Sequence, residues 1–170
     1  MSKAFTKDDD ANASEVLVVP RAPLPDGVSN YVTPRGLRAL RLEQTVIEQR
    51  RSAFEAADPA DRLAQLQALA RRAYELAARI ASAELVLGQN QPQGEVRFGA
   101  RVTLRTESGQ EASYQIVGVD EAEAAAGRIA FTSPLARALL GVQVGGVGTL
   151  RTPRGSEELE VLAVAYETDE

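Results

Sequence analysis

The side chains that could do chemistry in this sequence are carboxylates and arginines, because the chain contains no histidine and no cysteine. This composition excludes thiolate nucleophiles, imidazole bases, disulfides and the usual zinc ligands. Any bound metal ion would therefore be held by carboxylates. Three carboxylates lie close together around Pro59, at Glu55, Asp58 and Asp61.

Two of these acids also have a structural role open to them. Asp58 precedes a proline, the arrangement of a helix N-cap followed by proline at the first helical position. Asp61 falls three residues later, where a carboxylate favours the helix dipole. The sequence therefore predicts that a helix starts at Asp58, and it leaves capping and metal binding as alternatives for these acids.

The elements that position the three acids are two predicted helices, folded back on each other as an antiparallel coiled coil at 31–88 with its tip near Pro59. Thr33 before Pro34 predicts the first helix start. Gln44 and Arg51 interrupt the apolar pattern of the first helix. Apolar residues at steps of three and four form the predicted seam: Leu37, Leu40, Ile47 and Phe54, then Leu66, Leu69, Ala73, Leu76, Ile80, Ala83 and Leu87.

Charge is unevenly distributed along a chain whose net charge is −5. The hairpin is the basic part, and all of its cations are arginines. Such a pattern is typical of a solvated coiled-coil face, and the alternative is contact with a phosphate backbone or an acidic wall. The predicted basic face contains Arg50, Arg51, Arg71 and Arg72.

The rest of the chain divides into a tail, a linker and a second unit. Residues 1–30 lack periodicity and predict a disordered tail. Residues 89–95 are a predicted linker, and 96–167 alternate in polarity as short antiparallel strands do, with one short helix opened by Ser133-Pro134. The fold class is therefore α+β, a helical hairpin followed by an antiparallel sheet domain. Apolar runs are too short to span a bilayer and the N-terminus lacks the order of a secretory signal, so a cytoplasmic protein is expected. We also expect a monomer.

Four segments carry a resemblance to a known family: YVTPRGL at 31–37, GEVRFGA at 94–100, IVGVDE at 116–121 and TSPLARALL at 132–140. Together they resemble the Gre family of bacterial transcript-cleavage factors. The resemblance implies an FKBP-like second domain that docks on RNA polymerase at the rim of its secondary channel. The implied docking residues are Thr132, Ser133, Pro134 and Arg137.

The resemblance also implies a role for the hairpin. In the family the coiled coil enters the channel, near the 3′ end of the nascent RNA, and acids at the tip help to hold Mg²⁺ shared with the polymerase active centre. The candidates for that role here are Glu55, Asp58 and Asp61, because they are the only carboxylates at the predicted turn. The factor is then no enzyme by itself, but at most a stimulator of the cleavage that the polymerase performs.

This sequence departs from that family pattern at the hairpin. Each arm is shorter by roughly two helical turns, and EAADPAD at 55–61 does not match the acidic tip signature. These departures favour a regulator that occupies the channel and competes with cleavage factors over one that stimulates cleavage. Two further alternatives are a peptidyl-prolyl isomerase, for which the domain offers few aromatic side chains, and a hairpin that pairs between chains through Gln44 and Arg51.

Overall fold

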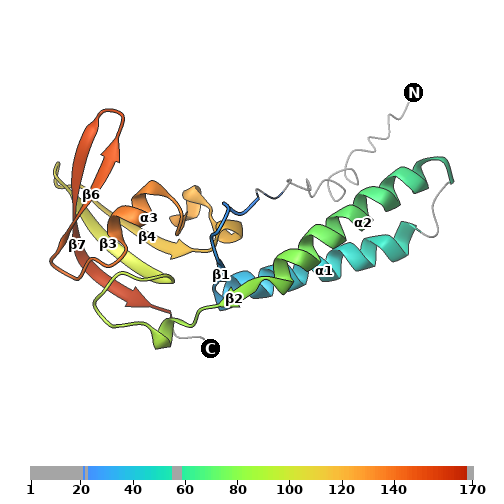
Figure 1. Ribbon diagram of the computed structural model, residues 1–170, viewed down its shortest axis with the longest axis horizontal. Coiled ribbons are helices and arrows are strands. Elements are labelled where there is room, and N and C mark those ends of the chain that lie inside the picture. Colours follow the sequence, from blue (N-terminus) through green and yellow to red (C-terminus); the bar gives the residue numbers. More distant parts are fainter. Residues whose placement is uncertain (1–20, 22, 55–58, 168–170) are drawn as a thin grey trace, which may run out of the picture.

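The protein folds into a helical hairpin joined at its base to a curled five-stranded sheet (Figure 1). The computed structural model describes residues 21, 23–54 and 59–167. Most of the predicted tail lies outside these residues. In the described part of the chain, no helix is both long and apolar enough to cross a membrane.

The hairpin consists of α1 (Pro34–Phe54) and α2 (Pro59–Ala81). The Thr33 hydroxyl accepts a hydrogen bond from the Gly36 backbone N–H at 3.1 Å, which confirms the predicted N-cap. The predicted seam is confirmed at the base of the hairpin, while Gln44 and Arg51 are exposed. Its buried members are Leu40, Ile47 and Leu76, packed with Leu37, Leu69, Ala73, Ile80 and Ala83.

The predicted helical repeat runs to Leu87, but α2 ends at Ala81. The next residues form β2 (Ala83–Leu85), which pairs in parallel with β1 (Asn30–Val32). The Asn30 side-chain amide donates to the Arg79 carbonyl at 2.8 Å, satisfying an acceptor that the helix leaves free at its end. The helix prediction is therefore wrong beyond Ala81, because pairing with a distant segment overrides the local pattern.

The sheet has the strand order β5-β4-β3-β7-β6, and α3 packs on it. Its pairs are antiparallel except β4–β5, which is parallel. The prediction of a wholly antiparallel sheet is wrong at that pair, because the connection 118–127 carries the chain back through two 3₁₀ turns, η2 (Val119–Glu121) and η3 (Ala124–Ala126). The elements are β3 (Ala100–Thr106), β4 (Glu111–Val117), β5 (Arg128–Ala130), α3 (Pro134–Leu139), β6 (Val147–Thr152) and β7 (Gly155–Tyr166).

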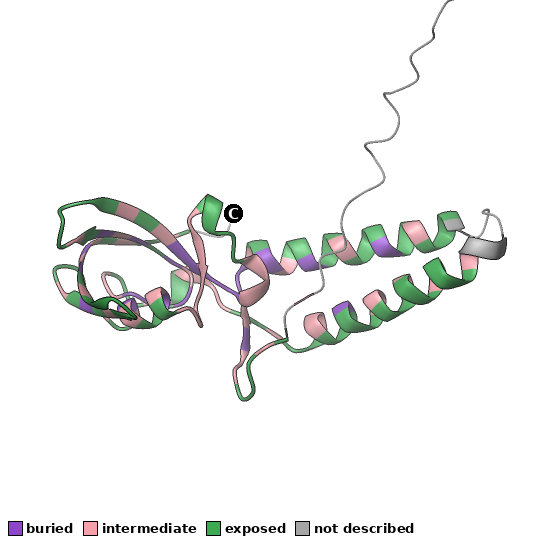
Figure 2. Ribbon diagram, turned by 90° about the horizontal axis from the view of Figure 1, so that it is seen from above, coloured by how far each residue is buried: buried purple, intermediate pink, exposed green. Residues whose placement is uncertain are grey.

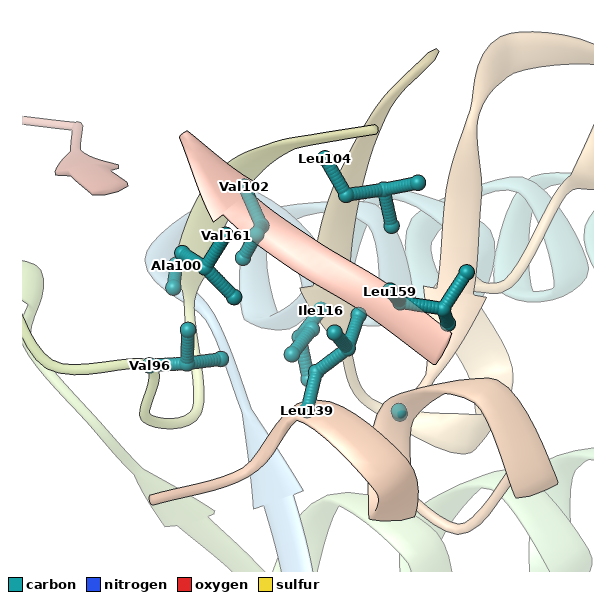
Figure 3. Close-up of a cluster of buried hydrophobic side chains, with 9 residues drawn as sticks. Val96, Ala100, Val102, Leu104, Ile116, Leu139, Leu159 and Val161 are labelled. Carbon is teal, nitrogen blue, oxygen red and sulfur yellow. The ribbon is translucent and has the colours of Figure 1, made fainter. Parts of the chain in front are cut away.

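The core of the sheet domain lies between the sheet and α3 (Figure 3). Leu104, Ile116 and Leu139 are almost completely buried there. The hairpin, by contrast, is exposed over most of its surface (Figure 2). The two parts match the predicted α+β class, and the sheet domain supplies a packed base for the protruding hairpin.

Candidate functional site

The predicted tip acids are largely outside the described residues. Glu55 and Asp58 are not described, and Asp61 lies in the first turn of α2 with only its backbone described. Their role as Mg²⁺ ligands therefore stays a prediction. Within residues 21, 23–54 and 59–167, no group of three or more acidic, histidine or cysteine side chains could hold a metal ion.

The predicted docking residues gather at the start of α3. The Ser133 hydroxyl accepts a hydrogen bond from the Ala136 N–H at 3.2 Å, so Ser133 is the N-cap of this helix and Pro134 is its first residue. Pro134 and Arg137 are exposed, while Thr132 is half-buried. The cap fixes the helix start, and the result is a surface that presents a rigid proline and a guanidinium.

The buried side of α3 explains why that surface is held in place. Ala136 and Leu139 are completely buried against the sheet. Gly148 on β6 lies beneath the helix, where a Cβ would come within 2.4 Å of the Ala138 carbonyl oxygen. Only glycine allows so close an approach of strand and helix.

The four arginines of the predicted basic face are not gathered on one unpaired surface in the described hairpin. Three of them pair with hairpin glutamates at 3.0 to 3.3 Å: Arg51 with Glu48, Arg71 with Glu75, and Arg72 with Glu43. Arg50 is half-buried. Arg71 and Arg72 are neighbours in one helix and so point about 100° apart. This arrangement suits a solvated coiled coil better than a phosphate-binding surface.

A cluster that the sequence did not assign lies where the hairpin meets the sheet domain. Its centre is Asp120 and Glu121, two adjacent acids in η2, here called the acidic pair. The Glu121 carboxylate accepts hydrogen bonds from the Thr33 backbone N–H at 2.9 Å and from the Thr33 hydroxyl. It also accepts from the Gly118 N–H at 3.3 Å. Glu121 therefore holds the start of α1.

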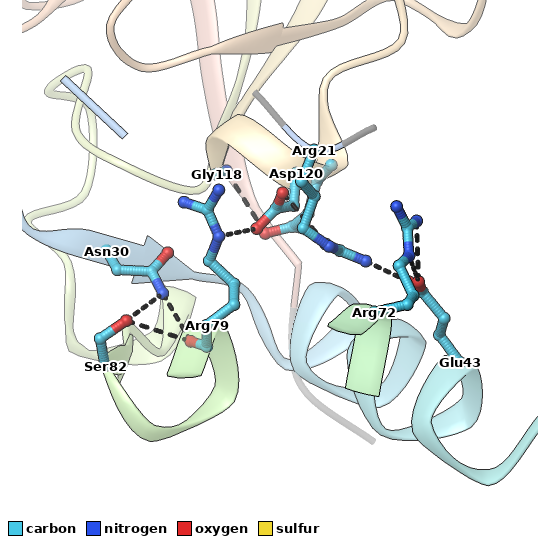
Figure 4. Close-up of polar contacts among 9 residues, drawn as sticks. Arg21, Asn30, Glu43, Arg72, Arg79, Ser82, Gly118 and Asp120 are labelled. Atoms are coloured by element: carbon cyan, nitrogen blue, oxygen red, sulfur yellow. Dashed lines mark hydrogen bonds and ion pairs between the residues drawn. The ribbon is translucent and has the colours of Figure 1, made fainter. Parts of the chain in front are cut away.

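Asp120 holds the other helix of the hairpin. Its carboxylate is 3.3 Å from Arg79 Nε in the last turn of α2, and both side chains are 9% exposed. Arg21, which precedes β1, lies 3.0 Å from the same carboxylate and also pairs with Glu43 on α1 (Figure 4). Arg72 completes a chain of alternating charges that links the segment at Arg21, both helices and the sheet domain.

Aromatic side chains close the other side of this junction. Tyr31 from β1 lies 5.7 Å from Phe98 and 5.5 Å from Phe131, measured between ring centroids, and the two phenylalanines lie 5.6 Å apart. Such tilted and edge-to-face ring contacts are favourable beyond their burial. These rings thus pack against one another at the base of the hairpin, where they also line an open hollow beside Arg97 and Leu140.

One signal of this junction was present in the sequence. A glycine in the first turn of a helix, Gly36, is a poor helix former. Here a Cβ at Gly36 would lie 2.1 Å from the Glu121 carboxyl carbon, so the glycine makes room for the acid. The acid itself, 88 residues away from Thr33, gave no local signal of its partner.

Comparison with known proteins places the chain in a family. The family model of the transcription elongation factor GreA/GreB C-terminal region matches residues 91–166. A transcription elongation factor GreB of Neisseria meningitidis serogroup B is 35% identical over 153 residues, covering 81% of this chain and 94% of that protein.

Other matches are shorter or looser. A transcription elongation factor GreA of Methylococcus capsulatus is 44% identical over 97 residues, and the match spans 56% of this chain and 61% of the length of that relative. The crystal structure of Thermus aquaticus Gfh1 superposes with a TM-score of 0.39 and 25% identity, covering 79% of this chain and 96% of that one. The assignment rests on the sequence matches: the chain belongs to the GreA/GreB family of transcription elongation factors.

Proposed function

We propose that the protein acts on bacterial RNA polymerase, docking through the exposed side of α3 and presenting the hairpin to the enzyme. The observation that carries this proposal is the start of α3, where a capped helix exposes Pro134 and Arg137 on a buried base. The relatives are transcription elongation factors by name. The α2 helix of 23 residues gives the arm a length of about 35 Å.

The protein is not itself the catalyst under this proposal. Any chemistry on RNA is performed by the polymerase, and the hairpin changes access to its active centre. Carboxylates at the tip, Glu55, Asp58 and Asp61, are of the type that binds Mg²⁺ through oxygen. The shortened arm and the diverged tip favour a regulator that competes with cleavage factors, and stimulation of cleavage is the alternative outcome.

The test is the rate of RNA cleavage in stalled, backtracked complexes of the cognate polymerase. The protein is added alone and then together with an authentic cleavage factor. Acceleration by the protein alone, lost in Asp61→Ala, would identify a cleavage stimulator. If the protein alone does not change the cleavage rate but slows cleavage by the authentic factor, it is a competitor. No effect in either experiment would refute action on the polymerase.

Docking is tested by matched charge reversals on exposed arginines of the sheet domain. Arg137→Glu alters the proposed docking surface, while Arg154→Glu changes an exposed arginine in the turn between β6 and β7. Both variants keep Ser133, so the α3 cap remains. We expect weaker polymerase binding by Arg137→Glu only. Equal affinities of the two variants would contradict docking through α3.

A further inference from the structure

We propose that Asp120 and Glu121 are positioning residues that fix the direction of the hairpin relative to α3. We also propose that Arg21 supports them by pairing with Asp120 and with Glu43. This inference rests on the proposed function, because the direction of the hairpin matters only if α3 docks on the polymerase and the hairpin extends toward its active centre. The acidic pair lies in the sheet domain, and its partners lie on both helices of the hairpin.

The first attachment is the set of hydrogen bonds between Glu121 and the start of α1. One carboxylate accepts from both the backbone and the hydroxyl of Thr33. Thr33 is 8% exposed, so these donors are shielded from water. Backbone approaches backbone here as well, since a Cβ at Gly118 would lie 2.5 Å from the Tyr31 carbonyl oxygen. The contact is therefore close and specific in geometry.

The second attachment is the pair between Asp120 and Arg79 at the end of α2. A single contact between two rigid bodies leaves a pivot about which they can turn. Two contacts on different helices restrict that rotation to the single axis that passes through both. The ring cluster of Tyr31, Phe98 and Phe131 adds a third, apolar contact at the base of the hairpin.

Charge burial indicates that the ion pairs of this junction serve geometry more than stability. Arg21 and Arg72 are 15% and 13% exposed, Asp120 and Arg79 are each 9% exposed, and Glu43 is 30% exposed. Buried ion pairs add little to stability compared with apolar packing of similar size, since desolvation offsets their attraction. In this arrangement, however, Asp120 and Glu43 each lie beside two guanidinium groups, which another orientation would separate from them. A chain of five alternating charges across four segments therefore selects one orientation.

The lever arm amplifies any loss of this orientation. For an arm of about 35 Å, a rotation of about 10° at the base moves the far end by about 6 Å. If the tip contributes to the reaction, misplacement of reacting groups by about 1 Å can reduce a rate on the order of 100-fold. If the hairpin competes with a cleavage factor, the same displacement moves it out of the path of that factor. Docking, in contrast, depends on α3 and should be unaffected. Removing the charges of the acidic pair should thus leave polymerase binding unchanged while it reduces the effect of the protein on RNA cleavage.

The experiment uses the full chain and two readouts. Because the protein has no cysteine, spin labels can be attached to cysteines introduced at the exposed Gln49 on α1 and Ser156 on β7. Electron spin resonance then gives the distribution of distances between hairpin and sheet domain. The second readout is RNA cleavage in backtracked complexes, recording separately the maximal effect and the concentration for half of it.

The variants are Asp120→Asn with Glu121→Gln, which keep side-chain shape and remove charge. Glu111→Gln is the matched control, an exposed glutamate paired with Arg105 on the sheet surface. We expect the double variant to broaden the distance distribution and to reduce the maximal effect at least about tenfold, with the half-effect concentration within about threefold of the parent. The control should match the parent in both readouts. If the double variant fails to fold, Glu121→Gln alone replaces it.

Two results would overturn the proposal. One is an unchanged, narrow distance distribution in the charge-removed variant. The other is an unchanged maximal effect despite a broadened distribution, which would show that the polymerase tolerates any hairpin direction. If the parent has no effect on the polymerase, the proposed function fails, while the distances still decide whether the acidic pair fixes the orientation. Arg21→Gln should broaden the distribution less than the double variant.

Discussion

Replacing Gly36 with alanine should destabilise the protein, although alanine is the better helix former. Gly36 lies in the first turn of α1, and helix propensity alone predicts that alanine stabilises by about 1 kcal/mol. The added Cβ would lie 2.1 Å from the Glu121 carboxyl carbon and 2.3 Å from its Oε1. The two cannot occupy this space together, so the glutamate must move.

The size of the effect follows from what the carboxylate binds. The Glu121 carboxylate is the end of a flexible side chain, so it can rotate away, and relieving the overlap itself costs little. What is lost is the acceptor for the backbone and hydroxyl donors of Thr33. Hydrogen bonds to charged groups contribute about 1.5 to 3 kcal/mol each. After the gain in helix propensity, Gly36→Ala should reduce the free energy of unfolding by about 2 to 5 kcal/mol.

Urea unfolding followed by circular dichroism at the helical band measures this change through the midpoint and slope. The decisive comparison is a double-mutant cycle with Glu121→Ala. In that background the obstacle is absent, so Gly36→Ala should stabilise by up to about 1 kcal/mol. If Gly36→Ala destabilises equally in both backgrounds, contact with Glu121 is not the reason for the glycine, and the geometry of the junction is refuted.

Three further outcomes are expected from stability measurements. Ser133→Ala should cost about 1 kcal/mol because it removes the cap of α3, and Ser133→Asp should restore it; equal stability of the two variants would contradict the capping role. Leu76→Ala in the buried seam should cost about 2 to 5 kcal/mol, while Leu63→Ala, at a residue 65% exposed, should stay within about 0.5 kcal/mol in the same urea assay. Burial raises the pKa of the Tyr166 phenol, opposed by the Arg97 N–H that donates to it, so the folded state binds this proton more tightly and the free energy of unfolding should fall as the pH rises above about 10. Tyr166→Phe should lose stability less steeply than the parent between about pH 9 and about pH 11, and an equally steep loss would contradict this account.

The helix starts and the sheet-forming segments were predictable from short-range patterns. Thr33-Pro34 and Ser133-Pro134 open helices as their types predict, because a cap depends only on residues three positions apart. The seam residues Leu40 and Leu76 are buried as the heptad steps require. The roles expected of Glu55 and Asp58 lie outside the described residues, and docking through Pro134 stays a prediction for the polymerase assay.

The tertiary structure decided the features that join distant segments. The end of α2 at Ala81 depends on β1, about 50 residues earlier, because pairing with that strand competes with continued helix. The parallel β4–β5 pair depends on the path of the chain from 118 to 127.

By itself, then, the sequence determined the hairpin, the strands of the sheet domain and the capped helix, since these follow from periodicity and capping within a few residues. Only the tertiary structure decided that Asp120 and Glu121 hold the two helices of the hairpin. An acidic side chain carries no local mark of its partner. Which donor or cation it meets is fixed by how the two parts pack, because a carboxylate buried away from water needs a partner and only that arrangement supplies one.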